Sequence, residues 1–413
     1  MSLIVQKFGG TSLENAEKIH RAARRAIRAK LDGRHVVLVV SAMGRSTDEL
    51  LSLASEVCHD PPKRELDVLL TTGEQVSIAL VAMAIHSAGH EAISLTAAQL
   101  GLVTNSTHTR ARIQRISRER IDRELGSGRI VIVAGFQGTD AGGEITTLGR
   151  GASDTTAAAL ASVLGAKTCE IYTDVDGVYT SDPRIVPQAR KIGEISYDVM
   201  LEMAATGAGV MHSRAIEFGK KFGVPIHVRS SLTDAKGTMI MAETCDMEAI
   251  AVQGVTLKED LAFFSLNAVP NHRGVAARIF AEVARHGVLV DDIVQNIYDH
   301  GKLANLGFST NASDAWEAKS VCERLAEQLG IASVEVDEGV CKVSAVGVGM
   351  RSHTGIASTM FDALSKADIN IENISTSEIV ISCIVRQDDG PSALRHLHTA
   401  FGLDTGKNSK EAS

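Results

Sequence analysis

The sequence predicts an α/β protein in which helices cover both faces of a mostly parallel sheet, followed by two copies of a smaller ferredoxin-like module. Two observations predict this architecture. Through residue 245, short β-branched runs alternate with amphipathic helical stretches, as in βαβ units. Beyond residue 262, a pattern of strands and helices recurs with a shift of 81 positions. The chain therefore combines a large sheet domain with a tandem repeat.

The strands of the large sheet are short apolar runs, found at residues 3–8, 35–40, 130–134, 169–172 and 224–228. Helical stretches lie between them, for example at 76–88 and 154–164. Polar or glycine-rich clusters follow several strands, at 9–10, 41–44, 135–138 and 173–177. Because sheets of this kind bind ligands at the carboxyl ends of their strands, these clusters predict the ligand site.

The six residues Lys7–Ser12 form the most informative cluster. Two glycines let a phosphate approach the backbone, and Lys7 adds a positive charge beside the amides of the next helix. Thr11 and Glu14 have the spacing of a capping box, which predicts that the helix begins there. A plain turn with a solvated lysine would have the same sequence, so the remaining clusters must decide between the two interpretations.

Each copy of the repeat predicts a β-α-β-β-α-β unit. Residues 274–280 and 288–293 of the first copy match residues 355–361 and 369–374 of the second. We expect the sheet domain at 1–245 and the two modules at 262–337 and 340–403. A strand from 249–256 is expected to complete the second module, and the polar tail, 404–413, is expected to be disordered.

Composition excludes several classes of protein. The 413 residues are enough for two or three domains, and 44% hydrophobic with 22% charged residues is typical of soluble globular proteins. A net charge of −8 argues against sequence-independent nucleic-acid binding. No uninterrupted apolar run approaches the roughly 20 residues that span a bilayer, and the N-terminus lacks a signal-peptide pattern. The six cysteines form no Cys-x-x-Cys pair. We therefore expect a cytoplasmic protein with reduced thiols and no zinc site.

Familiar nucleotide and metal motifs are absent or incomplete. The chain has neither a G-x-x-x-x-G-K-[ST] phosphate loop nor the H-R-D and D-F-G motifs of protein kinases. Residues 347–352 lack the third glycine of a dinucleotide fingerprint. Residues 174–185 end in isoleucine, where a calcium loop needs a glutamate.

Two further clusters suit phosphoryl transfer to a small amino acid. The segment 146–154 opens a helix and contains Arg150, which could grip a carboxylate with two hydrogen bonds. It also contains Asp154, which could orient the phosphates or a magnesium ion. The segment 71–75 places Glu74 at a predicted helix start, where its carboxylate suits an ammonium group. Each cluster alone would also fit ordinary helix capping.

Five clusters together resemble the aspartate kinases of the amino-acid kinase superfamily, and the repeat resembles their paired ACT domains. The clusters are residues 7–12, 40–48, 72–75, 149–154 and 172–184. The resemblance covers essentially the whole chain. It implies the amino-acid-kinase three-layer αβα sandwich followed by two ACT domains, with ATP and Mg²⁺ as cofactors. The implied product is 4-phospho-L-aspartate, the first intermediate towards lysine, threonine, methionine and diaminopimelate.

The resemblance also implies roles for individual residues. Lys7 and Asp154 would be catalytic, with Lys7 stabilising the transferred phosphoryl group and Asp154 organising Lys7 and the metal. The implied nucleotide-binding residues are Lys7, Phe8, Gly9, Gly10, Thr173, Asp174, Tyr179 and Arg184. The implied aspartate-binding residues are Ser41, Thr47, Glu74, Arg150, Gly151 and Ser153. The acceptor carboxylate has a pKa near 3.9 in solution, so it is already ionised at neutral pH and needs no general base.

In this family the ACT pair binds end-product amino acids, usually lysine or threonine, and commonly joins chains into homo-oligomers. The implied effector contacts are Asn271, Gly274, Ala276, Asp292, Gln295, Asn370, Ile371, Ser377 and Glu378. Tyr298–Leu306, Ala357 and Thr359 are unlike the family pattern. The identity of the effector and the need for a second subunit therefore stay open.

Three residues near the implied site depart from the family pattern. Ala152 stands where a third glycine is usual, which is tolerable only if its backbone angles are ordinary. Gly209 and Ser213 stand where the family has lysine and proline. Losing that lysine removes a positive charge from the nucleotide side. The sequence therefore predicts weaker ATP binding than is usual, unless Lys220 or Lys221 substitutes.

Two alternatives to aspartate kinase have some support. Glu74 and Arg150 would also suit glutamate, so a kinase of another acidic amino acid is one alternative, although the ACT pair favours aspartate. Gly209 suggests a catalytically weakened, amino-acid-binding regulatory subunit as the other. Retention of Lys7 and Asp154, with Glu74 and Arg150, argues against this second alternative.

Overall fold

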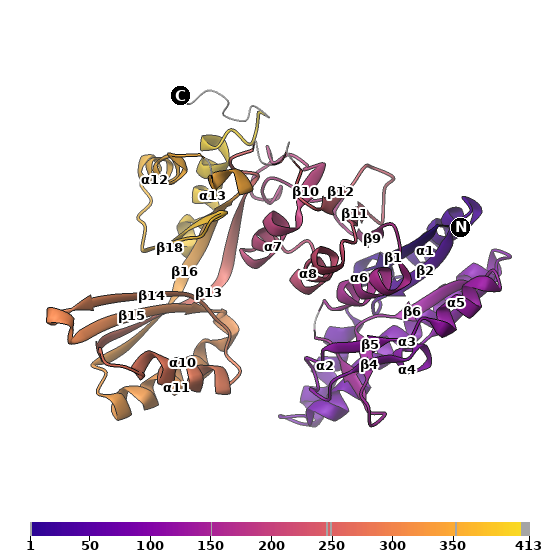
Figure 1. Cartoon of the computed structure of the whole chain (residues 1–413), viewed down its shortest axis with the longest axis horizontal. Helices are drawn as coiled ribbons and strands as arrows, with labels where there is room; N and C mark the ends of the chain where they lie inside the picture. Colours follow the sequence, from indigo (N-terminus) through magenta and orange to yellow (C-terminus); the bar gives the residue numbers. More distant parts are fainter. Residues whose placement is uncertain (1, 150, 245–246, 248–249, 352, 406–413) are drawn as a thin grey trace. The chain divides into compact units, whose positions relative to one another are not determined.

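The computed structural model describes residues 2–149, 151–244, 247, 250–351 and 353–405. Arg150, residue 249 of the expected completing strand and residues 406–413 of the expected tail lie outside these described residues. The chain forms two compact units (Figure 1). The first unit holds residues 1–179, 191–205 and 209–248. The second holds residues 180–190, 206–208 and 249–413.

An eight-stranded sheet forms the centre of the first unit, with the strand order β10-β12-β11-β9-β1-β2-β6-β3. Neighbouring strands are parallel except for β11 and β12. The strands are β1 (Leu3–Phe8), β2 (His35–Val40), β3 (Ala92–Leu95), β6 (Ile130–Ala134), β9 (Cys169–Thr173), β10 (Glu194–Ser196), β11 (Ile226–Ser230) and β12 (Thr238–Met241). This mostly parallel sheet confirms the predicted α/β class.

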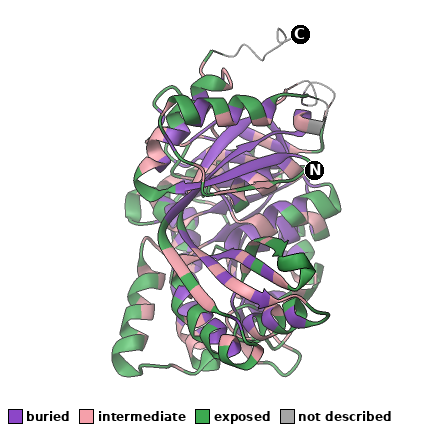
Figure 2. Cartoon of the chain, turned by 90° about the vertical axis from the view of Figure 1, so that its left-hand side faces the viewer, coloured by how far each residue is buried: buried purple, intermediate pink, exposed green. Residues whose placement is uncertain are grey.

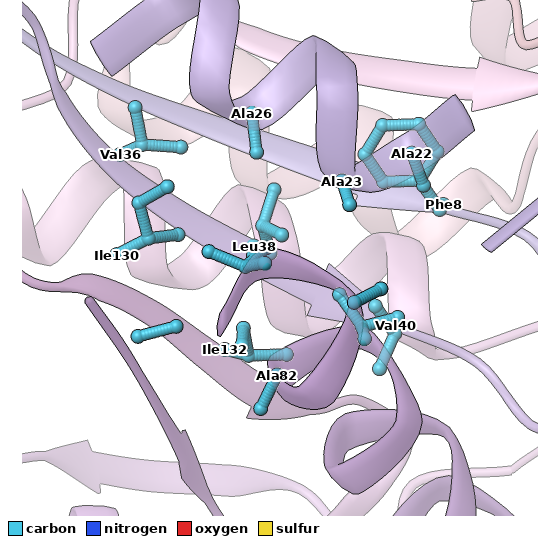
Figure 3. Close-up of a cluster of buried hydrophobic side chains, with 14 of the residues drawn as sticks. Phe8, Ala22, Ala23, Ala26, Val36, Leu38, Val40, Ala82, Ile130 and Ile132 are labelled. Carbon is cyan, nitrogen blue, oxygen red and sulfur yellow. The ribbon is translucent and has the colours of Figure 1, made fainter. Parts of the chain in front are cut away.

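Helices α1 (Ala16–Leu31) and α3 (Lys63–Ser87) cover one face of this sheet (Figure 3). The alanines of α1 and Ala82 of α3 pack on the aliphatic side chains of β2 and β6, and their small size allows the helices to approach closely. Helix α6 (Ser153–Leu164) contacts β1, β2 and β9, and α8 (Ser213–Phe222) lies beside α6. Successive side chains of a strand point to opposite faces, so Phe8 faces α1 whereas Lys7 faces α6.

Shorter elements complete the first unit. A small sheet has the order β5-β4-β7-β8 and consists of β4 (Leu102–Thr104), β5 (Ile113–Ile116), β7 (Gln137–Thr139) and β8 (Ile145–Thr147). The remaining helices are α2 (Ser46–Val57), α4 (Ala97–Leu100), α5 (Glu119–Gly126) and α7 (Tyr197–Ala205). Strand β8 leads through a short loop into α6, so the small sheet sets where that loop begins.

The predicted start of the first helix is wrong. Helix α1 begins at Ala16, and Asn15 is its N-cap, with a side chain that accepts a hydrogen bond from the amide of Lys18 at 3.1 Å. Thr11 lies instead in a short 3-10 turn, Gly10–Ser12. The chain first tightens through this turn and then becomes extended at Asn15, so the helix starts several residues later than the capping-box spacing suggests.

The predicted position of Glu74 at a helix start is also wrong. Helix α3 begins at Lys63, directly after Pro62, and runs through Glu74 without a break. The hydroxyls of Thr71 and Thr72 bond back to carbonyls of the preceding turn, which makes them compatible with a helix interior. Gly73 is also explained, because a Cβ there would lie 2.8 Å from the Cβ of Ala42.

By length and composition alone, α3 could cross a membrane. Its apolar residues Ile78, Val81 and Ile85 belong to the core between α1 and the sheet. Such burial is the behaviour of a core helix, which passes the same test of length and composition.

The second unit contains a six-stranded sheet with the order β14-β15-β13-β16-β18-β17, in which all pairs are antiparallel. Its strands are β13 (Gly254–Pro270), β14 (Val290–Tyr298), β15 (Leu303–Thr310), β16 (Ser333–Val346), β17 (Asn373–Thr376) and β18 (Val380–Arg386). Its helices are α10 (Val275–Arg285), α11 (Ala315–Leu329), α12 (Ile356–Lys366) and α13 (Gly390–Ala400).

The two modules of the second unit share the long strands β13 and β16. Residues 261–267 of β13 pair with 333–340 of β16, and a core with α10 and α11 forms there. Residues 254–258 pair with 342–346, beside the core with α12 and α13. The first segment of β13 therefore serves the second module, and the first module is inserted between that segment and the rest.

Two short segments from within the expected sheet domain belong to the second unit. Val186 is buried in the core with α12 and α13, and the buried Thr180 hydroxyl lies 2.9 Å from Nε2 of His398. Thr206 bonds through its hydroxyl to Thr256 of β13 at 2.7 Å. Figure 2 shows buried strands beneath helices whose outer faces are exposed, and strands of the six-stranded sheet such as β14 also carry intermediate and exposed residues.

Candidate active site

Four of the predicted clusters meet at the carboxyl edge of the large sheet. The amide of Gly9, after β1, donates to the carbonyl of Tyr172 in β9 at 3.2 Å. The amide of Ser41, after β2, donates to the carbonyl of Phe8 at 3.1 Å, and that of Gly135, after β6, donates to Val40 at 3.0 Å. The ends of adjacent parallel strands therefore bring together residues that are far apart in the sequence.

Lys7 and Asp154 form an ion pair at this edge. The Nζ of Lys7 lies 2.6 Å from Oδ1 of Asp154, and the two side chains are only 11% and 8% exposed. Asp154 is in the first turn of α6, where the positive end of the helix dipole favours its charge. A Cβ on Gly9 would lie 3.4 Å from the same Nζ, so the ammonium group is directly beside the Gly9 backbone.

Residues 9–12 form what we call the phosphate turn, which packs tightly on the loop after β2. A Cβ on Gly10 would lie 2.8 Å from the carbonyl oxygen of Ala42, and the amide of Gly44 donates to the carbonyl of Gly10 at 3.0 Å. Only glycine fits this close approach. The Ser12 hydroxyl is buried and, among the described residues, has no hydrogen-bond partner. Ser12 is thus a polar group at this turn that remains available for a ligand.

Glu74 reaches the same loop from the interior of α3. It is 3% exposed, and its Oε1 accepts a hydrogen bond from the amide of Ala42 at 3.1 Å. Its Oε2 is buried without a hydrogen-bond partner among the described residues. Burial raises the pKa of this carboxyl group to about 7. An ammonium group placed beside Oε2 would supply the missing partner.

Residues 148–152 connect β8 to α6, and together with Ser153, the first residue of α6, we call them the substrate loop. Gly151 has φ +73°, and a Cβ there would lie 2.8 Å from the His212 ring. The buried Ser153 hydroxyl lies against Gly135, where a Cβ would be 2.6 Å from Oγ. Ala152 is fully buried with φ −75° and ψ 1°, which are ordinary angles, so its methyl group is accommodated. Arg150 lies outside the described residues. Ser41 and Thr47 are half-buried near this edge and at the start of α2.

His212 is a residue of this region that the sequence analysis did not select. Its amide donates to Oδ2 of Asp154 at 3.3 Å, and its Nδ1 accepts from the amide of Arg214, capping α8. Burial lowers the pKa of the His212 ring, which favours the neutral imidazole. No motif marks it, because its contact with Asp154 spans 58 positions of sequence.

The predicted nucleotide-side residues separate into two groups. The Thr173 hydroxyl donates to Asp174 at 3.0 Å, at the end of β9. Tyr179 donates to Asp176 at 2.7 Å, which raises the pKa of the phenol to about 12. Arg184 is different, because it belongs to the second unit and pairs with Asp182. The place of Arg184 beside the nucleotide therefore stays a prediction.

The backbone at positions 209 and 213 could accommodate the lysine and the proline that the family has there. Gly209 is exposed, and a Cβ there would meet no atom within 4 Å. Ser213 is the first residue of α8, where proline is well tolerated. Lys220 pairs with Asp198, and it lies near the far end of α8, roughly 12 Å along the helix axis from His212. It is therefore poorly placed to replace a lysine at 209.

Each module of the second unit contains a cavity. One of about 90 Å³ is lined by four predicted effector residues, Asn271, Gly274, Ala276 and Gln295, together with neighbouring side chains. The other, about 510 Å³, is lined by Ser377 and Glu378 with His353 and Gly355 among others. Asn370 and Ile371 are not among the residues that line either cavity. Asp292 is engaged elsewhere, because Lys342 donates to its Oδ2 at 2.8 Å.

Known proteins resemble this chain along its whole length. The profile of the amino acid kinase family matches residues 2–230, and that of an ACT domain matches residues 343–401. An aspartokinase of Bacillus sp. (strain MGA3) is 47% identical over 403 residues, which cover 98% of each chain. The aspartate kinase Ask_LysC of Stutzerimonas stutzeri (strain A1501) is 46% identical over 405 residues, again 98% of each. The chain belongs to the aspartokinases of the amino acid kinase family.

Solved structures of aspartokinases have the same fold. Escherichia coli aspartokinase III in complex with aspartate and ADP, in its R-state, has a TM-score of 0.84 at 25% identity, covering 97% of this chain and 100% of that one. The same enzyme in complex with lysine and aspartate, in its T-state, has a TM-score of 0.76 at 25% identity, covering 96% and 99%. Membership of the aspartokinases makes this chain a kinase that phosphorylates aspartate, which confirms the predicted family, activity and fold class.

Proposed function

We propose that the carboxyl edge of the large sheet transfers the γ-phosphoryl group of ATP to the side-chain carboxylate of L-aspartate. The observation that supports this most directly is the buried Lys7–Asp154 ion pair beside Gly9. A lysine held in one position next to a glycine turn is suited to stabilising charge on a phosphoryl group during its transfer. The ADP and aspartate bound to E. coli aspartokinase III agree with this choice of substrates.

ATP binds with its phosphates on the phosphate turn. Lys7, Phe8, Gly9 and Gly10 supply a cation and close backbone approach, and Thr173, Asp174 and Tyr179 lie on the nucleoside side. Two observations support phosphate binding at this turn: the tight packing of Gly10 and the Ser12 hydroxyl, which has no hydrogen-bond partner among the described residues. Mg²⁺ neutralises phosphate oxygens when bound, and Asp154 or Asp174 would hold it. Such an ion needs few protein ligands, because phosphates and water supply the others.

Aspartate binds between the substrate loop and α3. Its ammonium group pairs with Oε2 of Glu74, and its carboxylates contact Arg150 together with Ser41, Thr47, Gly151 and Ser153. The attacking side-chain oxygen is already ionised, so no residue has to remove a proton. Catalysis then consists of alignment and charge neutralisation.

The phosphoryl transfer needs no general base. A side-chain oxygen of aspartate forms a bond to the γ-phosphorus while the bond to the β,γ-bridging oxygen breaks, so that ADP leaves with the bonding electrons. Lys7 stabilises the oxygens of the transferred group, and Asp154 holds the lysine in position. The product, 4-phospho-L-aspartate, is an acyl phosphate at the head of lysine, threonine, methionine and diaminopimelate synthesis.

The ACT domains carry regulation by an amino acid, for which lysine or threonine is the leading candidate. The cavity beside Asn271 and Gln295 and the larger one beside Ser377 and Glu378 support this role. The lysine complex of E. coli aspartokinase III supports it as well. We further propose that the chain works in the cytoplasm as a homo-oligomer joined through its ACT domains.

A coupled assay of ADP formation tests the proposal. The purified chain is supplied with MgATP and with aspartate, with glutamate or with neither, and hydroxylamine traps the acyl phosphate as a hydroxamate. We expect ADP and hydroxamate only with aspartate. Equal rates with glutamate would contradict the substrate assignment. ADP formation that does not depend on either amino acid would contradict the transfer itself.

A further inference from the structure

A buried carboxylate on α3, which is not itself part of a predicted cluster, accepts hydrogen bonds from two other segments. Asp67 is 0% exposed and lies seven residues before Glu74, so the two carboxylates share a face of the helix. A carboxylate that is fully removed from water is costly unless its oxygens are satisfied. The donors that satisfy Asp67 therefore show what it holds in place.

Three groups donate to Asp67. The Thr147 hydroxyl donates to Oδ1 at 2.6 Å, and the Thr109 amide lies 3.1 Å from both oxygens. His108 donates to Oδ2 through Nδ1 at 2.8 Å. None of these donors belongs to α3, and Thr147 is the last residue before the substrate loop. Asp67 thus ties that loop and the segment 108–111 to the helix that carries Glu74.

The segment 108–111 in turn supports the substrate loop. The amide of Ala111 donates to the carbonyl of Thr147 at 2.8 Å, and a Cβ on Gly149 would lie 3.5 Å from the carbonyl oxygen of Thr109. Arg214 of α8 donates to the carbonyls of Leu148 at 2.6 Å and Ala111 at 3.3 Å. The start of the loop is therefore held by Asp67 on one side and by Arg214 on the other.

Thr109 adopts an unusual backbone conformation, with φ +66°. β-branched residues rarely occupy this region, and such a conformation persists only where the surroundings fix it. The bonds from the Thr109 amide to both oxygens of Asp67 provide that constraint. The conformation directs the Thr109 carbonyl towards Gly149.

We propose that Asp67 is a positioning residue for aspartate binding. It acts through Thr147 and Thr109, which fix the substrate loop relative to Glu74. The group that binds the ammonium of the substrate and the groups that bind its carboxylates are thereby held at a set separation. This inference rests on the proposed function, because it assigns the substrate loop and Glu74 to aspartate. The residues proposed to bind the ATP phosphates and nucleoside lie in or after β1 and β9, and none of the three groups bonded to Asp67 belongs to these segments. Loss of Asp67 should therefore weaken aspartate binding and leave ATP binding largely intact.

Steady-state kinetics of variants of the full chain test this role. Asp67→Asn replaces one acceptor oxygen and removes the negative charge that the three partners share, so we expect the KM for aspartate to rise at least tenfold, while the KM for ATP stays within twofold. Thr147→Val removes one donor and is milder, and we expect its KM for aspartate to rise at least threefold. Thr147→Ser keeps the hydroxyl and should restore the wild-type value within twofold.

Glu124→Gln is a matched control, because Glu124 is a buried carboxylate of the same unit that pairs with Arg120 and Arg129 away from the substrate loop. We expect it to lower the melting temperature without changing either KM. If Asp67→Asn and Thr147→Val also lower only the melting temperature, or raise both KM values equally, the positioning role is wrong. Wild-type chain without aspartate-dependent ADP formation would overturn the proposed function and this inference together.

Discussion

The buried carboxyl group of Glu74 makes aspartate binding depend on pH. Its pKa is raised to about 7 by burial, and only the ionised form attracts an ammonium group. In the free enzyme the ionised fraction falls from about 90% at pH 8 to about 10% at pH 6, so kcat/KM for aspartate should fall roughly tenfold over this range. In Glu74→Gln, loss of the ion pair should raise the KM for aspartate about a hundredfold, which corresponds to ~3 kcal/mol.

The assay measures kcat/KM for aspartate from pH 6 to pH 8.5 at saturating MgATP. A parallel series varies ATP at saturating aspartate. In this series kcat/KM for ATP should not fall as Glu74 protonates, because bound aspartate keeps the carboxylate ionised. The profile of Glu74→Gln should be flat in the region where the wild type changes. A wild-type profile for aspartate that is flat between pH 8 and 6, or one that the variant reproduces, would refute the reasoning.

The same shift has a consequence for stability. Between about pH 4.5 and pH 7 the folded chain keeps a proton on Glu74 that the unfolded chain has released. The free energy of unfolding therefore decreases as pH rises through this window, and the full loss, on the order of 3 kcal/mol, is present above pH 7. Glu74→Gln should consequently be at least as stable as the wild type at pH 8 in chemical denaturation, although its activity is impaired.

Three other substitutions, two of them with a second variant for comparison, test separate parts of the molecule. Lys7→Ala should lower turnover about 100-fold or more, because the transferred phosphoryl group loses its main cation. Circular dichroism should show that the fold is retained, and the melting temperature should fall because the buried Asp154 loses its partner. Lys18→Ala, which removes an exposed helix pair, is the control, and retained activity in Lys7→Ala would contradict the catalytic role. Gly209→Lys should lower the KM for ATP about fivefold, since an added charge near phosphate contributes ~1 kcal/mol at a surface, and an unchanged KM would show that position 209 does not face the nucleotide. Asn271→Ala should weaken inhibition by the effector amino acid, measured as a higher half-inhibitory concentration. Asp292→Asn should mainly lower the melting temperature, because Lys342 loses a partner. The opposite pattern would place the effector at Asp292.

The sequence was sufficient to predict contacts that follow from the regular geometry of strands. The family resemblance implied that Asp154 organises Lys7, and the pleat of β1 and the start of α6 place the two side chains 2.6 Å apart. The meeting of Gly9 and Ser41 at one sheet edge also follows from parallel strands that end together. Such features depend on local pattern and on one topological rule.

Other features depended on packing that local pattern does not encode. Glu74 was expected at a helix start, just before the helical stretch 76–88, yet α3 runs through it, and Gly73 gives room for the side chain of Ala42. Asp67 and His212 belong to no recognisable motif, and their partners lie tens of residues away in the sequence. Local pattern also did not show that Val186, in the segment after Tyr179, packs in the core of the second unit.

The path of the chain between its two units limits how the protein can be divided or recombined. The chain passes from one unit to the other five times, at residues 179/180, 190/191, 205/206, 208/209 and 248/249. A cut after the large sheet domain would leave Val186 without the apolar core that buries it. An exchange of regulatory modules between relatives would therefore have to carry Thr180–Arg190 and Thr206–Ala208 along with the ACT pair. The two short segments are therefore constrained twice during evolution. Their length must connect parts of the catalytic domain, and their side chains must pack with the regulatory unit.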